Sequence, residues 1–435
     1  MSDAPRDIGL AELQDALEKP ETRLLDLRPI EAFNGWPLRG EARGGHIPGA
    51  IPFPFAWTRY RLEVHELLRE HGATPERSIV LYGYDAGESR QMAELLDGIG
   101  CRDVRCYDRF VEQWAADRSL PLERMPRYDR LVCPAWVREL AENRRDGRPS
   151  VICHSHYDCI DDYHRGHIPG AIALNTNDLE SPETWNRRSP EELRLALAAH
   201  GITRNATVVV YGRFSFPSND DPYPGQAAGH LGAMRCAAIL LWAGVEDVRV
   251  LNGGMNRWEE AGLPVSTEPT RPTPATDYGG EIPGRPEVFV DTPEAKRLLA
   301  SDDGELASVR SWDEFVGRVS GYHYIERKGR IPGAVFADCG SDAYHMENYR
   351  NLDYTTRNYE AIAAMWERAG LTPDKHVAFY CGTGWRGSEA FFNAWLMGWP
   401  RVSVYDGGWM EWSSDPANPI ATGEPSRAED TIDAS

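Results

Sequence analysis

Short β-prone runs alternate with segments of helical periodicity along the chain. In the first third, such runs stand at 24–27, 79–82 and 104–107, and amphipathic helical patterns separate them. Short apolar strands that are covered by helices are typical of a parallel sheet in an α/β protein. The pattern therefore predicts an α/β fold in which mainly parallel sheets are flanked by helices.

An internal repeat decides how many such sheets the chain contains. The segment Gly-His-Ile-Pro-Gly-Ala-Ile at 45–51 returns at 166–172, and Gly-Arg-Ile-Pro-Gly-Ala-Val stands at 329–335. Two further marks follow in the same order in each copy: an apolar run that ends in Tyr and then Gly or Cys (79–83, 208–212, 377–381), and a strand and turn followed by Trp114, Trp258, or Trp409 and Trp412. Three ordered marks that recur three times predict three tandem domains of one kind.

The repeat also sets the expected boundaries. We expect the first domain to span 5–122, the second 128–268 and the third 286–422, with a flexible acidic tail at 423–435. A chain of 435 residues has room for about three domains of ordinary size.

Two segments between the repeated marks are expected to lack regular structure. The Pro/Thr/Gly-rich stretch 267–286 has too little apolar content to pack and indicates an extended linker. The Ser/Asn/Asp/Pro-rich insertion at 213–228 is too long for a simple strand-to-helix turn. We expect this insertion to cover a neighbouring domain or the mouth of an active site.

Charge and cysteine usage narrow the function classes. The formal net charge of −20 disfavours nucleic acid and anionic membranes as partners. No apolar run reaches membrane-spanning length, and no signal-peptide pattern opens the sequence, so we expect a cytoplasmic protein. No CxxC pair occurs, so we expect no metal site and reduced thiols at the eight cysteines: Cys101, Cys106, Cys133, Cys153, Cys159, Cys236, Cys339 and Cys381.

Only the third domain carries a candidate nucleophile. The β-prone run 376–380 ends at Cys381, a Gly-rich loop follows, and a helical pattern spans about 388–397. A strand that feeds a helix through such a loop points backbone N–H groups into a small cup. That cup and Arg386 favour a thiolate, whereas the alternative is a core cysteine before a turn. The first two domains carry Gly83 and Gly212 at this position, and glycine cannot carry sulfur.

The segment Cys-Gly-Thr-Gly-Trp-Arg at 381–386 resembles the six-residue active loop of rhodanese-type sulfurtransferases. Only four residues separate Cys381 from Arg386, one fewer than in a tyrosine phosphatase loop. The segments 329–335 and 404–412 resemble the upstream and downstream signatures of the rhodanese family. The resemblance implies that Cys381 carries a persulfide and that the first two domains are inactive. These domains would then shape the pocket, support the third domain or form the face of a homodimer.

A narrower resemblance rests on the loop and on the inserted segment 315–328. Trp385 and Arg386 replace the Val-Thr of mercaptopyruvate sulfurtransferases, and the insertion brings three aromatic residues, Tyr322, His323 and Tyr324. Together these features resemble the anaerobic ergothioneine synthases. Such enzymes move sulfur from polysulfide to the imidazole carbon of hercynine, which is trimethylated histidine.

The narrower resemblance assigns roles to residues of this chain. It implies catalytic roles for Cys381, Tyr322 and Tyr380, and no cofactor beyond the persulfide. It implies that hercynine and polysulfide are the small-molecule partners. It places the substrate-binding loop at Gly382, Thr383, Gly384, Trp385, Arg386 and Gly387. Candidates to hold the trimethylammonium group are Trp385, Trp409, Tyr344, and Asp342 or Asp353.

Several assignments stay open at the level of sequence. Arg386 either adds charge to the cup or pairs with Glu389 or a loop carbonyl. Thr383 either contacts the substrate or only shapes the loop. His323 either does acid–base work or is a surface residue.

Two other functions stay open as well. A basic pocket that contains Arg318, Arg327 and Arg330 would support a thiosulfate or 3-mercaptopyruvate sulfurtransferase. An exposed apolar patch beside Cys381 would favour a sulfur-relay module that passes persulfide sulfur to a partner protein.

Overall fold

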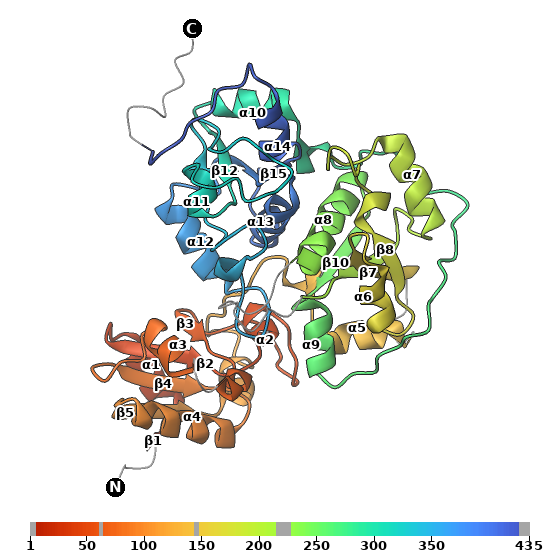
Figure 1. Ribbon diagram of the computed structural model, residues 1–435. Helices are drawn as coiled ribbons and strands as arrows, with labels where there is room; N and C mark the ends of the chain where they lie inside the picture. The colour runs from red at the N-terminus through yellow and green to blue at the C-terminus, as the bar shows by residue number, and fades with distance from the viewer. Residues whose placement is uncertain (1–5, 61–63, 143–147, 215–227, 426–435) are drawn as a thin grey trace. The chain divides into compact units, whose positions relative to one another are not determined.

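The computed structural model describes residues 6–60, 64–142, 148–214 and 228–425 (Figure 1). Nearly all of the insertion at 213–228 and most of the predicted tail lie outside the described residues. The chain divides into two compact units, residues 1–129 and 130–435. The first unit contains the first predicted domain, and the second unit contains the other two.

The first domain is a five-stranded sheet with all strands parallel, in the order β1-β5-β4-β2-β3. Its strands are β1 (Arg6–Asp7), β2 (Thr22–Asp26), β3 (Ala50–Pro52), β4 (Ser78–Tyr82) and β5 (Asp103–Tyr107). Its helices are α1 (Leu10–Leu17), α2 (Ile30–Asn34), α3 (Val64–Glu70) and α4 (Ala86–Gly98). The three predicted strands are confirmed, and each begins one or two residues earlier than its apolar run.

The second domain repeats the same order with β6-β10-β9-β7-β8, again all parallel. Its strands are β6 (Leu131–Val132), β7 (Ser150–His156), β8 (Ile172–Asn175), β9 (Thr207–Tyr211) and β10 (Asp247–Leu251). Its helices are α5 (Pro134–Ala141), α6 (Ile160–Arg165), α7 (Pro190–Ala199), α8 (Ala228–Ala243) and α9 (Gly254–Glu260).

The third domain has the order β11-β15-β14-β12-β13, and its α13 packs against α8 of the second domain (Figure 1). Its strands are β11 (Phe289–Val290), β12 (Gly304–Ser308), β13 (Val335–Phe336), β14 (His376–Tyr380) and β15 (Val402–Tyr405). Its helices are α10 (Thr292–Leu299), α11 (Trp312–Phe315), α12 (Tyr359–Arg368), α13 (Trp385–Leu396) and α14 (Gly408–Ser414). Three copies of one parallel α/β domain are thus confirmed.

The tryptophan of the repeat has the same structural task in every domain. The indole N–H of Trp114 donates to the carbonyl of Pro121 at 2.9 Å. Trp258 and Trp412 make the matching bonds, each at 2.8 Å, to Pro264 and Pro419. A buried indole N–H needs an acceptor, and here the segment that leaves each domain provides it. This part of the repeat therefore serves the fold.

The linker prediction for 267–286 is wrong in one respect. The segment contains no helix or strand before Pro286, but it packs along the second domain. Tyr278 is fully buried, and its hydroxyl donates to the carbonyl of Ala243 at 3.0 Å. Ile282 is also buried. Two well-placed apolar side chains are enough to anchor the segment although its composition is polar.

Within the part of the chain that the structure describes, we find no helix with the length and apolar character needed to cross a membrane.

Candidate active site

Cys381 lies between the end of β14 and the start of α13, and it is only 1% exposed to solvent. The helix begins at Trp385, three residues before the predicted start, because Gly384 adopts φ +84° and turns the chain directly into the first helical turn. Ser388 N–H closes that turn on the Gly384 carbonyl at 2.8 Å. The first-turn N–H groups of α13 have no carbonyl partner within the helix, so the helix end favours an anion beside Cys381.

The downstream Gly-Gly-Trp signature holds this loop through backbone hydrogen bonds. The N–H groups of Trp409 and Met410 donate to the carbonyls of Cys381 and Gly382 at 2.8 and 2.9 Å. Gly408 has φ +53°, and a Cβ there would come within 2.8 Å of both carbonyls. The start of α14 therefore fixes the backbone of the nucleophile loop.

Arg386 is buried, and its partners lie on α11 and in the loop after the inserted segment. Its guanidinium donates twice to the Glu314 carboxylate, at 2.8 and 3.0 Å, and also to the Asp342 carbonyl at 3.1 Å. Burial alone would raise the pKa of Glu314, but Arg386 and Arg310 hold it at about 2. The pairing of Arg386 with Glu389 is not observed, because Glu389 pairs with Arg350 instead. Arg386 thus connects α13 to α11 and to the loop at Asp342, and it also lines the cavity.

Tyr322 lies directly against the nucleophile loop. Its hydroxyl oxygen accepts hydrogen bonds from the Gly382 N–H, at 3.2 Å, and from Arg386. A Cβ at Gly382 would lie 2.3 Å from the Tyr322 ring, so only glycine fits at this position. Burial raises the pKa of Tyr322 well above its usual value, with Arg386 opposing and Cys381 adding to the rise. The phenol is therefore neutral, and because two donors fill its lone pairs its own proton must be donated elsewhere.

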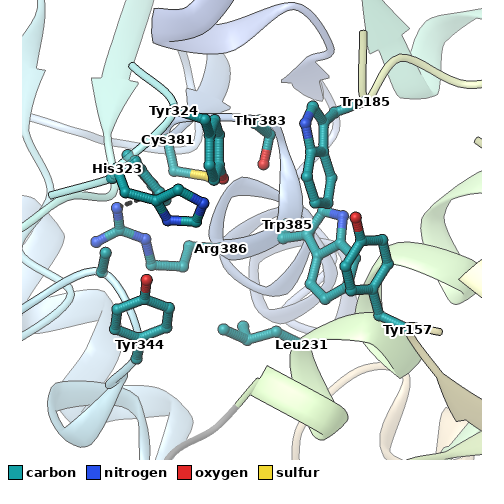
Figure 2. A pocket seen from close by; sticks show the side chains of 12 residues that line it. Tyr157, Trp185, Leu231, His323, Tyr324, Tyr344, Cys381, Thr383, Trp385 and Arg386 are labelled. Atoms are coloured by element: carbon teal, nitrogen blue, oxygen red, sulfur yellow. Dashed lines mark hydrogen bonds between the residues drawn. The ribbon is translucent and has the colours of Figure 1, made fainter. Parts of the chain in front are cut away.

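The loop and Tyr322 open into a cavity of about 370 Å³ (Figure 2). The third domain supplies most of its lining, and the second domain supplies Tyr157, Trp185 and Leu231. In Figure 2, Trp185, Trp385 and Tyr157 lie on one side of this space, and His323, Arg386 and Tyr344 lie on the other. The cavity is thus built jointly by the second and third domains.

One side of the cavity is an aromatic wall formed by Tyr157, Trp185, Tyr324 and Trp385. Trp185 stacks on Tyr324 with ring centroids 5.5 Å apart. Tyr157 lies 5.0 Å from Trp185 and 5.7 Å from Trp385, between ring centroids. Among the described residues that line the cavity there is no carboxylate. Ring faces without a counter-charge suit an organic cation that makes few hydrogen bonds.

The structure brings together most of the predicted site residues. Cys381, Tyr322, Thr383, Trp385 and Arg386 line the cavity, and the glycines at 382, 384 and 387 form the loop behind them. His323 and Tyr344 also line it. Thr383 is buried in the loop, lines the cavity and bonds through its side chain to the Tyr324 hydroxyl, so both alternatives for Thr383 stay open.

Other predicted candidates lie elsewhere. Trp409 is fully buried in the core, with its indole N–H on the Arg327 carbonyl at 3.0 Å. Asp353 is buried and accepts from Thr355, and the Asp342 carboxylate accepts the N–H groups of its own loop. Within the described residues, none of the three arginines that would make a basic pocket lines the cavity: Arg318, Arg327 and Arg330.

Sequence reasoning did not find Tyr157 and Trp185. They lie in the second domain and reach the cavity only because that domain packs against the third. Neither residue stands in a recognisable motif, although Trp185 adopts φ +62°, which is uncommon for a non-glycine residue. No sequence pattern therefore predicts that Tyr157 and Trp185 line the cavity, because their place depends on how the two domains pack.

Tyr380 is packed in the core of the third domain with Leu306, Tyr405 and Trp409. The tyrosines at the same repeat position, Tyr82 and Tyr211, accept the N–H groups of Ile47 and Ile168 at 3.3 and 2.9 Å. In those two domains, glycine stands at the position of Cys381. The position therefore serves the fold of each copy, and we expect the same of Tyr380.

This gives a first prediction. The Tyr380→Phe variant should keep its unfolding free energy within about 1 kcal/mol of wild type, because the ring stays in the core and only one buried hydroxyl is removed. Its rate of sulfur transfer should stay within about threefold of wild type, since the ring and its packing are kept. Denaturant unfolding and steady-state kinetics measure the two effects. A large loss of turnover in a stable Tyr380→Phe protein would instead support the catalytic role inferred from the sequence.

The family model of the rhodanese-like domain matches residues 9–117, 138–261 and 291–415. The chain belongs to the rhodanese family, and it is a sulfurtransferase of three rhodanese domains. It is 38% identical over 420 residues to the thiosulfate sulfurtransferase YnjE of Escherichia coli, covering 94% of this chain and 91% of that one.

Solved structures of EanB are also similar. EanB in complex with hercynine is 50% identical, with a TM-score of 0.94 over 98% of this chain and 100% of that chain. A variant of EanB with ergothioneine covalently linked to a persulfide cysteine is 51% identical, with a TM-score of 0.93 and the same coverage.

Proposed function

We propose that this sulfurtransferase moves sulfane sulfur from polysulfide, through a persulfide on Cys381, to the imidazole carbon of hercynine, and so forms ergothioneine. The observation that carries the proposal is the Tyr322 hydroxyl. It is held by two donors beside Cys381, is neutral at physiological pH, and has a proton to give to a ring in the cavity. The similarity to EanB structures that contain hercynine and ergothioneine supports the same acceptor.

The reaction balances without an external oxidant. The Cys381 thiolate takes one sulfur atom from polysulfide, which leaves one sulfur shorter, and the enzyme holds Cys–S–S⁻. The terminal sulfur then bonds to the ring carbon while the S–S bond breaks and the thiolate returns. The ring C–H proton leaves, and the net change is C–H to C–SH. A proton donor at a ring nitrogen, here Tyr322, activates the carbon.

The aromatic wall explains why the acceptor carries a trimethylammonium group. Three methyl groups cover the cationic nitrogen, so it makes no hydrogen bonds and binds well against ring faces. A primary ammonium group would leave three donors unsatisfied among these side chains. Both cations are attracted to ring faces, so the difference in binding comes from the unsatisfied donors of the primary ammonium, which cost about 1–3 kcal/mol.

The test follows from that difference. Incubated with polysulfide, the wild-type protein should add one sulfur atom to hercynine, and its kcat/KM for hercynine should exceed that for histidine by about 100-fold. Mass spectrometry of the small molecules measures both products. Histidine is the matched control, because it differs only by three methyl groups. Equal turnover of the two acceptors would show that the aromatic wall does not select the trimethylammonium group.

A second candidate is a thiosulfate sulfurtransferase, which the identity to YnjE favours. Rapid formation of thiocyanate from thiosulfate and cyanide, without thiolation of hercynine, would establish it. A protein-to-protein sulfur relay is less consistent with the site, because Cys381 is 1% exposed within a cavity rather than on an open apolar surface.

A further inference from the structure

A chain of buried polar contacts crosses between the second and third domains behind the aromatic wall. The Glu180 carboxylate is fully buried and accepts the Trp385 indole N–H at 3.0 and 3.1 Å and Arg235 Nε at 2.9 Å. Arg235 also donates to the Asp406 carboxylate at 2.6 Å and to the Trp185 carbonyl at 2.8 Å. Both tryptophans of the wall are therefore tied to one buried Glu–Arg pair of the second domain.

The second domain also shapes the space that the indole occupies. Gly232 lies on α8, and a Cβ there would come within 3.5 Å of the Trp385 ring. Leu231 beside it lines the cavity. Burial raises the pKa of Glu180 to about 7, although Arg235 and Trp385 oppose the rise. Several of the residues that contact the Trp385 indole thus belong to the second domain.

We propose that Glu180 is a positioning residue for the acceptor site. Its carboxylate holds the Trp385 indole in place, and the indole forms one face of the cavity. The proposal rests on the proposed function. An indole has one N–H donor and turns about two side-chain torsions. A hydrogen bond to a buried carboxylate fixes both, so the cation meets a ring face that is already ordered. The inactive second domain is then a required part of the acceptor site.

Two variants of Glu180 test this. Glu180→Gln keeps the shape but turns an amide N–H toward Arg235 or Trp385, and Glu180→Asp keeps the charge but withdraws the carboxylate from the indole. Each should raise the KM for hercynine about tenfold, as expected for one lost hydrogen bond to a charged group. The rate of persulfide formation on Cys381 should stay within about twofold of wild type, because loading does not use the wall.

The control separates positioning from stability. Arg187 belongs to the same interface and donates to Asp406 at 2.6 Å, but it does not line the cavity. Arg187→Gln should lower the melting temperature and leave the KM for hercynine within about twofold. A double variant of Glu180→Gln with Trp385→Phe should show no further rise in KM beyond Trp385→Phe alone.

The outcomes are distinct. An unchanged KM in both Glu180 variants, or an equal rise in Arg187→Gln, overturns the positioning role. A variant that folds poorly is detected because its persulfide loading falls together with its turnover, and the other Glu180 variant then decides. A wild-type enzyme that leaves hercynine unchanged overturns the proposed function and this inference together.

Discussion

Replacement of Cys381 by serine is expected to reduce sulfur transfer at least about 10⁴-fold while the protein stays folded. Serine has nearly the same size, but its hydroxyl cannot hold a persulfide. No other domain can take over, because Gly83 and Gly212 stand at the equivalent positions. Intact-protein mass spectrometry after incubation with polysulfide should show additions of whole sulfur atoms on the Cys381 peptide of wild type. The variant should show none there.

The remaining cysteines provide the control. Cys339 is the most demanding of them, because Arg386 donates to its sulfur at 3.0 Å. Burial nevertheless raises the pKa of Cys339 to about 12, with Arg386 opposing, so it remains a thiol at neutral pH. Cys339→Ala should therefore keep its activity. A comparable loss in a folded Cys339→Ala protein, or added sulfur that maps only to Cys101 or Cys153, would contradict a single nucleophile.

Tyr322→Phe is expected to slow thiolation of hercynine by about 10²- to 10⁴-fold, the usual span for a positioned acid–base group. The variant keeps the ring that lies over Gly382 and deletes only the hydroxyl. Persulfide formation on Cys381 should be nearly unchanged, because transfer between sulfur atoms needs no proton at a ring nitrogen. Single-turnover kinetics, with loading and transfer followed separately, measure the two steps.

Two further measurements establish whether the effect is chemical. Exchange of the hercynine ring C–H with deuterated water should slow in parallel if Tyr322 serves the activated ring. Tyr349→Phe is the matched control, because that hydroxyl is also buried, with bonds to Ala337 and Trp366, but lies away from the cavity. If Tyr322→Phe slows loading and transfer equally, Tyr322 has only a structural role.

The parts of the site that could be predicted from sequence are those in which the reactive residue and the residues that shape its backbone stand next to one another in the chain. Cys381, the loop glycines and Arg386 stand together in one turn, and the repeated strands around them set its place in the sheet. For Tyr322, the resemblance to the ergothioneine synthases pointed to the inserted segment, and the structure places Tyr322 against the loop. The start of α13 was placed too late, because the left-handed backbone of Gly384 carries no hydrophobic signal.

What could not be predicted depends on contacts between domains or on the task of a repeated residue. Tyr157, Trp185 and Glu180 reach the site only through the packing of α8 against α13. The sequence offers Trp409 as an aromatic candidate to hold the trimethylammonium group. The structure uses its side chain in the core, with its indole on a backbone carbonyl. The residue type alone does not reveal which way a side chain turns.

The aromatic wall has a consequence for how such an enzyme can change over generations. If Cys381 is the nucleophile, as we propose, the reaction belongs to its loop, whereas Tyr157 and Trp185 belong to a copy of the domain that carries Gly212 at the equivalent position. Substitutions in that copy can alter which acceptor is accepted without disturbing how sulfur is carried. On the proposed function, the repeated domains would divide the work: one copy would set which acceptor binds, and the other would carry the sulfur.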